Sequence, residues 1–353
     1  MPEDWQNFPD DALGQVWQDG LVMTESENRF SLTRAASITG GAAKNQILIC
    51  INHAILLVLA ALMFSAQARA AEDFSITIPA RFLVGYDAGL PLHANAQKTL
   101  ENDTFTRYHV TYLNDRGDTV TGILTLPKTT NSPFQTAFFQ HGMGDTKDCN
   151  YMLKGIKRFV ELGYAVFAID AMSFGERATP ITKNASPAIF FRYPFLLRSV
   201  LIQTAVDVRR GVDFLLTRED IDKNKIFYVG NSMGSMLGVM PTAVDKRFKR
   251  AVFIVGCADY ANKFTMTKLM GVPAGLFEIV DPKNYVGLIS PRPVLMINAT
   301  RDELVPKGAA DAFFAAAGEP KEQVWVNSQH DIDIVNGVDL IVDWFHKMDK
   351  AGM

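Results

Sequence analysis

The strongest indication of the fold is the stretch Ile226-Phe227-Tyr228-Val229-Gly230-Asn231-Ser232-Met233-Gly234. Here an apolar run of strand length ends directly at the pattern G-x-S-x-G, and apolar residues at helical spacing follow it. A strand, a sharp turn and a helix in this order expose a serine hydroxyl at the tip of the turn. The flanking glycines avoid contacts that a Cβ atom would make in such a turn. Ser232 is therefore a candidate nucleophile.

A serine hydroxyl needs a positioned base, and after this kind of turn the acid and then the histidine follow in the chain. Only His330 and His346 lie downstream of the serine. His346 falls inside the last predicted helix, whereas His330 lies in the loop before it, so His330 is the predicted base. Asp302 follows the apolar run 293–297 and is the predicted acid, with Glu303 as the nearest alternative.

Acyl transfer also requires backbone N–H groups that stabilise the oxyanion. One expected donor is the amide of Met233, at the start of the helix after the serine. The other is the amide of Met143, in the glycine-rich turn His141-Gly142-Met143-Gly144. His141 precedes the nucleophile in the chain, so we expect it to organise this turn rather than to act as a base.

Strands and helices alternate through most of the chain. The segments 108–112 and 119–126 have the pattern of an antiparallel β-hairpin with one solvated face. Apolar runs predict buried strands at 136–139, 164–169, 226–229, 251–255, 293–297 and 323–326. Helices are expected at 153–162, 199–216, 309–317 and 338–348. The pattern predicts an α/β protein with a doubly wound, mostly parallel sheet and an antiparallel N-terminal hairpin.

Two connections, 171–198 and 257–290, are too long for simple loops and are expected to form a cap. Aromatic and methionine residues in both predict an apolar-walled pocket for a short acyl or aromatic group. The first connection contains the aromatic residues Phe190, Phe191, Tyr193 and Phe195. We expect them to fold over the carboxyl edge of the sheet; the alternative is that they only pack on neighbouring helices.

The first seventy residues do not fit a globular domain. No Asp or Glu occurs from 28 to 71, and basic residues precede the apolar run 47–64. Ala68 and Ala70 then form an A-x-A pattern before Ala71. This combination predicts a secretory signal peptide. The alternative is an uncleaved membrane anchor, for which the run is marginal in length.

The predicted organisation is thus a leader, 1–70, and one catalytic domain, 71–353. The leader before the apolar run is long for a signal peptide, so translation starts at either Met1 or Met23. In both cases the upstream positive charge predicts export, to the periplasm or the medium. Contact with a membrane is expected only if 47–64 remains as an anchor.

The composition excludes several classes of partner. The chain has 353 residues and a formal net charge of -3, so it has neither a basic nor an acidic excess. Its charge therefore gives no indication of nucleic acid as a partner. Cys50, Cys149 and Cys257 are too few for a disulfide scaffold and lack metal-ligand spacing. We therefore expect no metal and no cofactor; whether Cys149 and Cys257 are bonded stays open.

The turn 141–144, the elbow 230–234, Asp302 and His330 together resemble the α/β-hydrolase superfamily, over about residues 108–344. The resemblance implies a serine hydrolase that cleaves a small-molecule carboxylic ester through an acyl-enzyme intermediate. Alternative functions are an exported serine peptidase or thioesterase of the same fold, or a non-catalytic hydrolase-like binding protein.

Two further segments narrow the resemblance. The segment 170–177, DAMSFGER, resembles the D-x-x-x-F-G-E-R segment of acetyl-xylan-esterase-like and dienelactone-hydrolase-like members. The segment 289–295 is similar to the one before the acid in those enzymes. Glu176 and Arg177 are interpreted as a structural ion pair rather than as catalytic residues.

Overall fold

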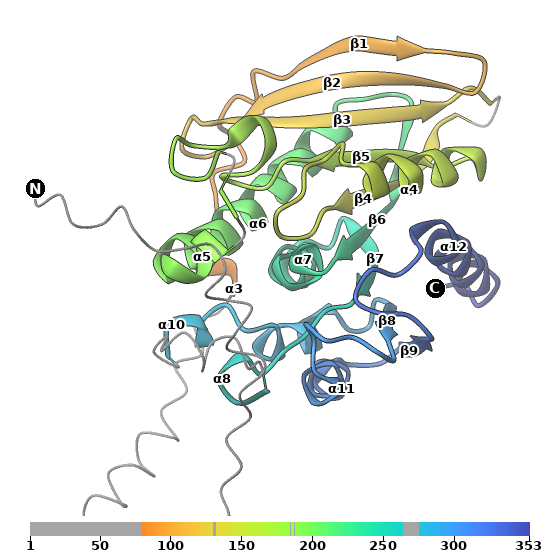
Figure 1. Cartoon of the computed structure of the whole chain (residues 1–353). Helices are drawn as coiled ribbons and strands as arrows, with labels where there is room; N and C mark the ends of the chain where they lie inside the picture. Colours follow the sequence, from red (N-terminus) through yellow and green to blue (C-terminus); the bar gives the residue numbers. More distant parts are fainter. Residues whose placement is uncertain (1–79, 130–131, 184, 187, 264–274) are drawn as a thin grey trace, which may run out of the picture. The chain divides into compact units, whose positions relative to one another are not determined.

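The computed structural model describes residues 80–129, 132–183, 185–186, 188–263 and 275–353 (Figure 1). The chain divides into two units, Met1–Asp73 and Phe74–Met353. The first unit lies outside the described residues, and so does the predicted leader with its apolar run 47–64. Its interpretation as a signal peptide or an anchor stays a prediction. Among the described helices, none combines the length and apolar character needed to cross a membrane.

In the described part of the second unit, nine strands form one sheet in the order β1-β2-β3-β5-β4-β6-β7-β8-β9. The strands are β1 (Asn95–Glu101), β2 (Phe105–Leu113), β3 (Thr119–Pro127), β4 (Phe134–Gln140), β5 (Ala165–Ile169), β6 (Ile221–Asn231), β7 (Phe248–Ile254), β8 (Val294–Ala299) and β9 (Lys321–Val326). Strands β1 to β3 are antiparallel, and β3 also pairs antiparallel with β5. The remaining pairs are parallel, so the expected mostly parallel sheet with an antiparallel hairpin is confirmed.

Helices cover both faces of the sheet (Figure 1). One face carries α4 (Asn150–Glu161) and α12 (Ile334–Lys350); the other carries α6 (Pro194–Leu216), α7 (Met233–Val244) and α11 (Lys307–Ala316). Successive strand residues point to opposite faces, so Phe138 belongs to one hydrophobic core and Phe139 to the other. This double covering explains why β5 and β8 are buried along their whole length and why all of their residues except Asn298 are apolar.

Strand β1 was not expected from the sequence. Its residues are exposed except for one half-buried position, and among the described strands it ends the sheet. Lys98 and Glu101 form an exposed ion pair on it, and its register shifts between Lys98 and Leu100. The hydrophobic pattern that identifies a half-buried strand is therefore missing here.

The two long connections contain short helices. The first contains the 3-10 turn η1 (Gly175–Arg177) and α5 (Ala188–Arg192), and α6 already begins at Pro194. Phe190 is buried and stacks on Phe174, with ring centroids 4.6 Å apart. Tyr193 and Phe195 are 49% and 65% exposed, and their place over the carboxyl edge of the sheet stays a prediction. The side chain of Phe191 lies outside the described residues.

The second connection contains α8 (Tyr260–Lys263), α10 (Gly275–Glu278), η2 (Pro282–Asn284) and η3 (Val286–Ile289). Residues 264–274 lie outside the described residues, so the predicted pocket stays a prediction. The two cysteines of the described part are both free. Cys257 is buried with its Sγ 3.4 Å from Met236 Sδ, and burial raises the pKa of its thiol.

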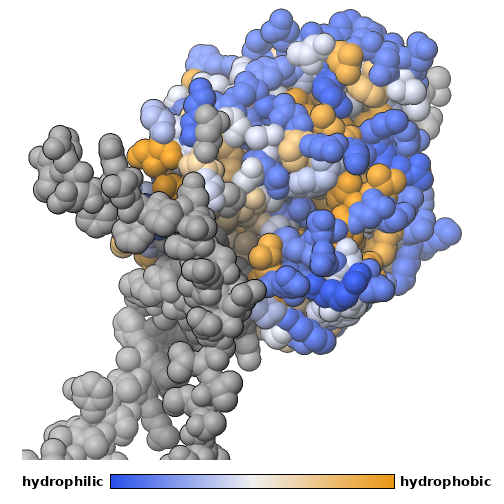
Figure 2. All heavy atoms as spheres, in the orientation of Figure 1, coloured by the Kyte–Doolittle hydropathy of each residue, from blue (hydrophilic) through white to orange (hydrophobic). Residues whose placement is uncertain are grey.

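The visible surface is mainly hydrophilic, with several separate hydrophobic patches (Figure 2). The most exposed large hydrophobic residues are Phe82, Ile181, Phe195, Leu288 and Leu304. Phe82 belongs to α3 (Ala80–Leu83), and Leu304 lies two residues after the predicted acid. Single exposed apolar residues of this kind are normal for a globular surface.

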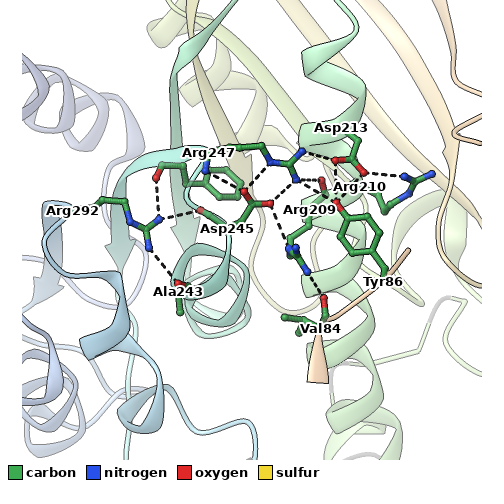
Figure 3. A network of polar contacts seen from close by, with 10 residues as sticks. Val84, Tyr86, Arg209, Arg210, Asp213, Ala243, Asp245, Arg247 and Arg292 are labelled. Carbon is green, nitrogen blue, oxygen red and sulfur yellow. Dashed lines mark hydrogen bonds and ion pairs between the residues drawn. The ribbon is translucent and has the colours of Figure 1, made fainter. Parts of the chain in front are cut away.

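A dense set of polar contacts surrounds the C-terminal end of α7 (Figure 3). Asp245, the residue that follows the helix, accepts hydrogen bonds from Arg247 and Arg209. Arg247 also donates to Asp213, which accepts a 2.9 Å bond from the Tyr86 hydroxyl. We call this set the arginine network; it comprises Tyr86, Arg209, Arg210, Asp213, Asp245, Arg247 and Arg292.

Arg292 attaches a more distant segment to the same helix end. Its guanidinium donates to the carbonyl oxygens of Ala243, Asp245 and Phe248, at 3.0 to 3.3 Å. The last carbonyls of a helix have no partner within the helix, and a cation placed there also complements the helix dipole. Arg292 thus caps the C-terminal end of α7.

Candidate active site

The candidate nucleophile lies at the turn between β6 and α7. Ser232 is the single residue between the strand and the helix, and its backbone has φ +52° and ψ -115°. A positive φ is strained for a residue with a side chain, and such strain occurs preferentially at functional sites. The turn therefore holds the serine in the conformation expected of an exposed nucleophile.

The glycines on either side of the serine are required by close contacts. A Cβ atom on Gly230 would lie 2.4 Å from the carbonyl oxygen of Gly234. A Cβ atom on Gly234 would lie 2.4 Å from the carbonyl oxygen of Gln140, at the end of β4. The elbow is thus packed directly against the neighbouring strand end, and no larger residue fits at either position.

Three loops at the carboxyl ends of strands bring the predicted side chains together. His330, from the loop between β9 and α12, has its Nε2 atom 2.9 Å from Ser232 Oγ. Its Nδ1 atom lies 2.8 Å from Asp302 Oδ2, in the loop after β8. We call these three residues the serine site. His346 lies on α12 and is exposed, and the carboxylate beside His330 Nδ1 belongs to Asp302 rather than to Glu303.

The carboxylate of Asp302 is fixed from a second side. Its Oδ1 atom accepts the backbone N–H groups of Leu304 and Val305, at 2.9 and 2.8 Å. Burial by itself raises the pKa of Asp302. The hydrogen bonds from His330 and from these amides lower the pKa by more than burial raises it, so the net pKa lies below its ordinary value. The group is therefore an ionised acceptor that orients the imidazole with Nδ1 protonated.

The two expected oxyanion donors come from neighbouring segments. Met233 is the first residue of α7, and the first amides of a helix have no partner within the helix. Met143 lies in the turn after β4, next to Gly142. A Cβ atom on Gly142 would lie 3.4 Å from Ser232 Cβ, so this turn passes alongside the nucleophile.

His141 organises the turn, as the sequence suggested. It is fully buried; its Nδ1 lies 2.7 Å from the carbonyl oxygen of Gly142, and its Nε2 accepts the amide of Ala171 at 3.0 Å. Burial lowers the pKa of this histidine, which favours the neutral ring that such a donor and acceptor pair requires. Both ring nitrogens are therefore used inside the structure.

One polar residue beside the serine was missed by sequence reasoning. The hydroxyl of Tyr151, on the first turn of α4, accepts the amide of Gly142 at 2.8 Å. A tyrosine near a helix start gives no signal for such contacts, which depend on how α4 docks on the turn.

Glu176 and Arg177 form ion pairs, but not with each other. Glu176 accepts a 2.6 Å hydrogen bond from Lys147 Nζ, and Arg177 lies 2.7 Å from the buried carboxylate of Asp207. Lys147 is itself buried and donates to Asp170 as well, at 2.9 Å. The expectation of a single Glu176–Arg177 pair was wrong, because the η1 turn directs the two side chains to different partners.

The described residues contain no group of three or more His, Cys, Asp or Glu side chains suited to a metal ion. The chemistry available at the serine site is instead that of an oriented hydroxyl, an imidazole base and a carboxylate. This combination activates a serine for attack on a carbonyl carbon.

Comparison with known proteins gives relatives at low identity. No protein-family model matches the chain. It is 26% identical over 203 residues to "Putative hydrolase YtaP" of Bacillus subtilis, covering 52% of this chain and 66% of that protein. It is 25% identical over 131 residues to "Uncharacterized protein YfhR" of Escherichia coli, covering 36% of this chain and 45% of that protein. The chain thus aligns with about half to two thirds of these curated relatives.

Solved structures match over a larger part. An acetyl xylan esterase from a Paenibacillus species has a TM-score of 0.61 at 18% identity, covering 74% of this chain and 90% of that one. Acetyl xylan esterase 1 from a Thermoanaerobacterium species has a TM-score of 0.60 at 16% identity, with coverages of 75% and 90%. A cold-adapted esterase from an Arctic metagenomic library has a TM-score of 0.54 at 20% identity, with coverages of 71% and 98%. At these identities the likeness concerns the fold.

Proposed function

This chain has the α/β-hydrolase fold, and from that premise we propose that it hydrolyses small carboxylic esters with Ser232 as the nucleophile. The observation that supports the proposal most directly is the continuous hydrogen-bonded chain from the serine to His330 to Asp302, with steps of 2.9 and 2.8 Å. The strained backbone of the serine and the glycines that permit it support the same function.

In the proposed mechanism, Ser232 Oγ attacks the ester carbonyl carbon while His330 Nε2 accepts the hydroxyl proton. Asp302 holds the Nδ1 proton and stabilises the imidazolium that forms. The carbonyl oxygen becomes an oxyanion that accepts hydrogen bonds from the amides of Met233 and Met143. The C–O bond to the alcohol then breaks, and His330 gives its proton to the leaving alkoxide.

The second half of the reaction releases the acid. Water attacks the acyl carbon and gives one proton to His330, which returns it to Ser232 Oγ as the acyl–serine bond breaks. The products are one alcohol and one carboxylic acid for each water consumed. The proposed residues perform every step with their own side chains and amides, so the mechanism uses no cofactor.

The ester class comes from the comparisons only in general terms. Two of the structural neighbours are named as acetyl xylan esterases and another as an esterase. We carry over the ester bond and not the xylan, since fold likeness does not identify a substrate. A thioester or peptide substrate remains an outcome of the test.

The deciding experiment combines labelling with turnover. A fluorophosphonate probe should label the protein on Ser232, and the purified chain should hydrolyse p-nitrophenyl esters faster than thioester or peptide analogues. Probe labelling together with faster thioester or peptide cleavage would replace the ester proposal with one of those two. Absence of both labelling and turnover would favour a non-catalytic binding protein.

We further propose that the chain is exported, on the basis of the apolar run 47–64 and the A-x-A pattern before Ala71. N-terminal sequencing of protein from its native host should find a start at or near Ala71. An intact protein embedded through 47–64 would favour the anchor, and a cytoplasmic protein that retains residues 1–70 would contradict both.

A further inference from the structure

The turn that carries the nucleophile has to hold two reacting groups in one strained conformation. In the proposed mechanism Ser232, with φ +52°, supplies the hydroxyl, and the next peptide unit supplies the Met233 N–H to the oxyanion. A strained backbone persists only where the surrounding structure over-determines it. A misplacement of about 1 Å at a reacting group can lower the rate about 100-fold. Contacts that fix this turn should therefore affect the reaction itself.

The direction of the Met233 N–H is set by the other end of its peptide unit. A trans peptide is planar, so its N–H and C=O groups point in opposite directions. Here the C=O belongs to Ser232, and its oxygen accepts the amides of Ser235 at 2.8 Å and Met236 at 3.2 Å. The position of Ser235 thus orients the N–H that is expected to bind the oxyanion.

The hydroxyl of Ser235 attaches this residue to two strands. The side chain is fully buried, and its Oγ atom donates to the carbonyl oxygens of Gly230 on β6 and Ile254 on β7, each at 2.7 Å. A hydroxyl has one hydrogen, so the two acceptors share it. The same Ile254 oxygen accepts the amide of Ser232 at 2.8 Å. The nucleophile and Ser235 are therefore bonded to one common carbonyl group.

A second buried hydroxyl holds the same turn from the side of the strand. Tyr228 lies on β6, and its hydroxyl donates to the carbonyl oxygen of Gly234 at 2.6 Å. A Cβ atom on Gly238, one turn further along α7, would lie 2.0 Å from the Tyr228 ring, so the glycine makes room for the tyrosine. Gly234 in turn packs on the start of the turn 141–144, because a Cβ atom there would lie 2.8 Å from the carbonyl oxygen of His141. Tyr228 thus fixes the part of α7 on which that turn rests.

The geometry points to Ser235 and Tyr228 as positioning residues that hold the Ser232 hydroxyl and the Met233 N–H in line for reaction, and this inference rests on the proposed ester hydrolysis. Core positions are ordinarily filled by apolar side chains. At these two positions the additional oxygen atom is in each case bonded to the backbone of the elbow 230–234. Both hydroxyls are fully buried, so neither touches the substrate in this role.

The first test is Ser235→Ala, which removes the hydroxyl oxygen and keeps the Cβ atom. We expect kcat to fall about 10- to 100-fold with KM nearly unchanged, because the loosened turn misplaces the reacting groups and leaves substrate binding intact. The affinity for a trifluoromethyl ketone, which forms a tetrahedral adduct on the serine, should fall in parallel with kcat. A wild-type kcat, or a loss confined to KM, would overturn the role of Ser235.

The matched control is Thr242→Val, on the same helix. The Thr242 hydroxyl is also fully buried and donates to two backbone carbonyls, those of Gly238 at 2.7 Å and Val239 at 3.0 Å. Its removal should leave kcat and inhibitor affinity as in the wild type. Equal losses of kcat in Ser235→Ala and Thr242→Val would show a general effect of weakening α7 and would count against the role.

Tyr228→Phe keeps the test valid if Ser235→Ala fails to fold, and it should lower kcat without raising KM. Its control is Tyr112→Phe on β2, which β3, β5 and β4 separate from β6. The buried Tyr112 hydroxyl likewise donates to a helix carbonyl, that of Asp207 on α6 at 2.7 Å, and a Cβ atom on Gly211 would lie 2.9 Å from it. Tyr112→Phe should keep the wild-type kcat. A wild-type kcat in Tyr228→Phe, or equal losses in both tyrosine variants, would contradict the role of Tyr228.

The labelling rate separates this inference from the function on which it rests. A fluorophosphonate reacts with an activated serine whatever the natural ester is. Slower labelling of Ser235→Ala than of the wild type supports the inference. Equal labelling of both contradicts the inference alone, and absence of labelling in the wild type contradicts the proposed function itself.

Discussion

Helix α7 connects two polar clusters that are built in opposite ways. At its N-terminal end, the serine site is a single chain in which Ser232 and His330 have few partners, and His330 remains partly exposed. At its C-terminal end, about 18 Å away for a helix of 12 residues, the arginine network links each carboxylate to several donors. The hydrogen bonds of the serine site can therefore rearrange during a reaction, whereas almost every hydrogen bond of the arginine network is held in place by its neighbours.

The difference indicates which cluster should govern activity and which should govern stability. A base that exchanges protons with its neighbour must be able to break its hydrogen bond during the reaction. A cross-linked set of partly buried ions loses stability when one member is removed, because the remaining charges keep their desolvation penalty. Activity and stability should therefore be separable by mutation.

The largest effect is expected for Ser232→Ala. Ester turnover should fall by roughly 10⁴-fold or more, and His330→Ala should lose about as much, since members of such a site act as a unit. The thermal unfolding midpoint should stay near that of the wild type, because neither side chain contributes to the buried core. Esterase assays and calorimetry on both variants measure this. Inactivation by the control His346→Ala, with His330→Ala active, would show that the base is wrongly assigned.

Arg247→Met should produce the reverse result. The variant leaves Asp213 and Asp245 without the cation that joins them, so the free energy of unfolding should fall by about 3 kcal/mol. The kcat of the folded protein should not change. Urea titration gives the stability, with Lys347→Met as the control, because its exposed pair with Glu322 is worth less than about 1 kcal/mol. A large loss of kcat in Arg247→Met would mean that the clusters are coupled through α7.

A pH series sharpens the same comparison. Burial by itself raises the pKa of Asp245, but the hydrogen bonds and charge of Arg247 and Arg209 outweigh it, so the net pKa lies below its ordinary value. Such a carboxylate stabilises the fold above its unfolded pKa of about 3.9, and this contribution is lost as the pH falls through the folded pKa. Asp245→Asn should therefore be less stable than the wild type at pH 7, with the gap shrinking in acid. A gap that is constant with pH would contradict the ionic origin.

The smallest effect is expected at the cap. Phe195 is 65% exposed, so Phe195→Ala should change stability by less than about 0.5 kcal/mol. If the first connection borders the substrate, kcat/KM should change by less than about tenfold and unequally across a series of ester chain lengths. Phe82→Ala, on α3, removes an equally exposed ring outside the cap and should leave the series unchanged. A uniform fall in both variants would place the substrate pocket elsewhere.

The serine site could be predicted from the sequence because its signals are local. The glycines around Ser232 mark the elbow, and after it the order of the chain favours His330, in a loop, as the base and Asp302, with Glu303 as the alternative, as the acid. The parallel sheet was predictable for a similar reason, since strands buried on both faces are continuous apolar runs.

The arginine network and Tyr151 could not be predicted in this way. Tyr86 and Arg247 are 161 residues apart, and the bond between them depends on how α6, α7 and the segment after α3 pack. Tyr151 meets Gly142 only because α4 docks against the turn at one particular angle. Contacts of this kind are set by tertiary packing, which the spacing of residue types does not encode.

The polar strand β1 has a consequence for the behaviour of the protein in concentrated solution. Among the described strands it ends the sheet, and its outer N–H and C=O groups form a template on which a strand of another copy can pair. Charged side chains and bulges at sheet edges oppose such pairing, and β1 has both, in Lys98, Glu101 and the register shift beside them. The residues that hid β1 from the hydrophobic pattern therefore oppose edge-to-edge pairing of two copies at this strand.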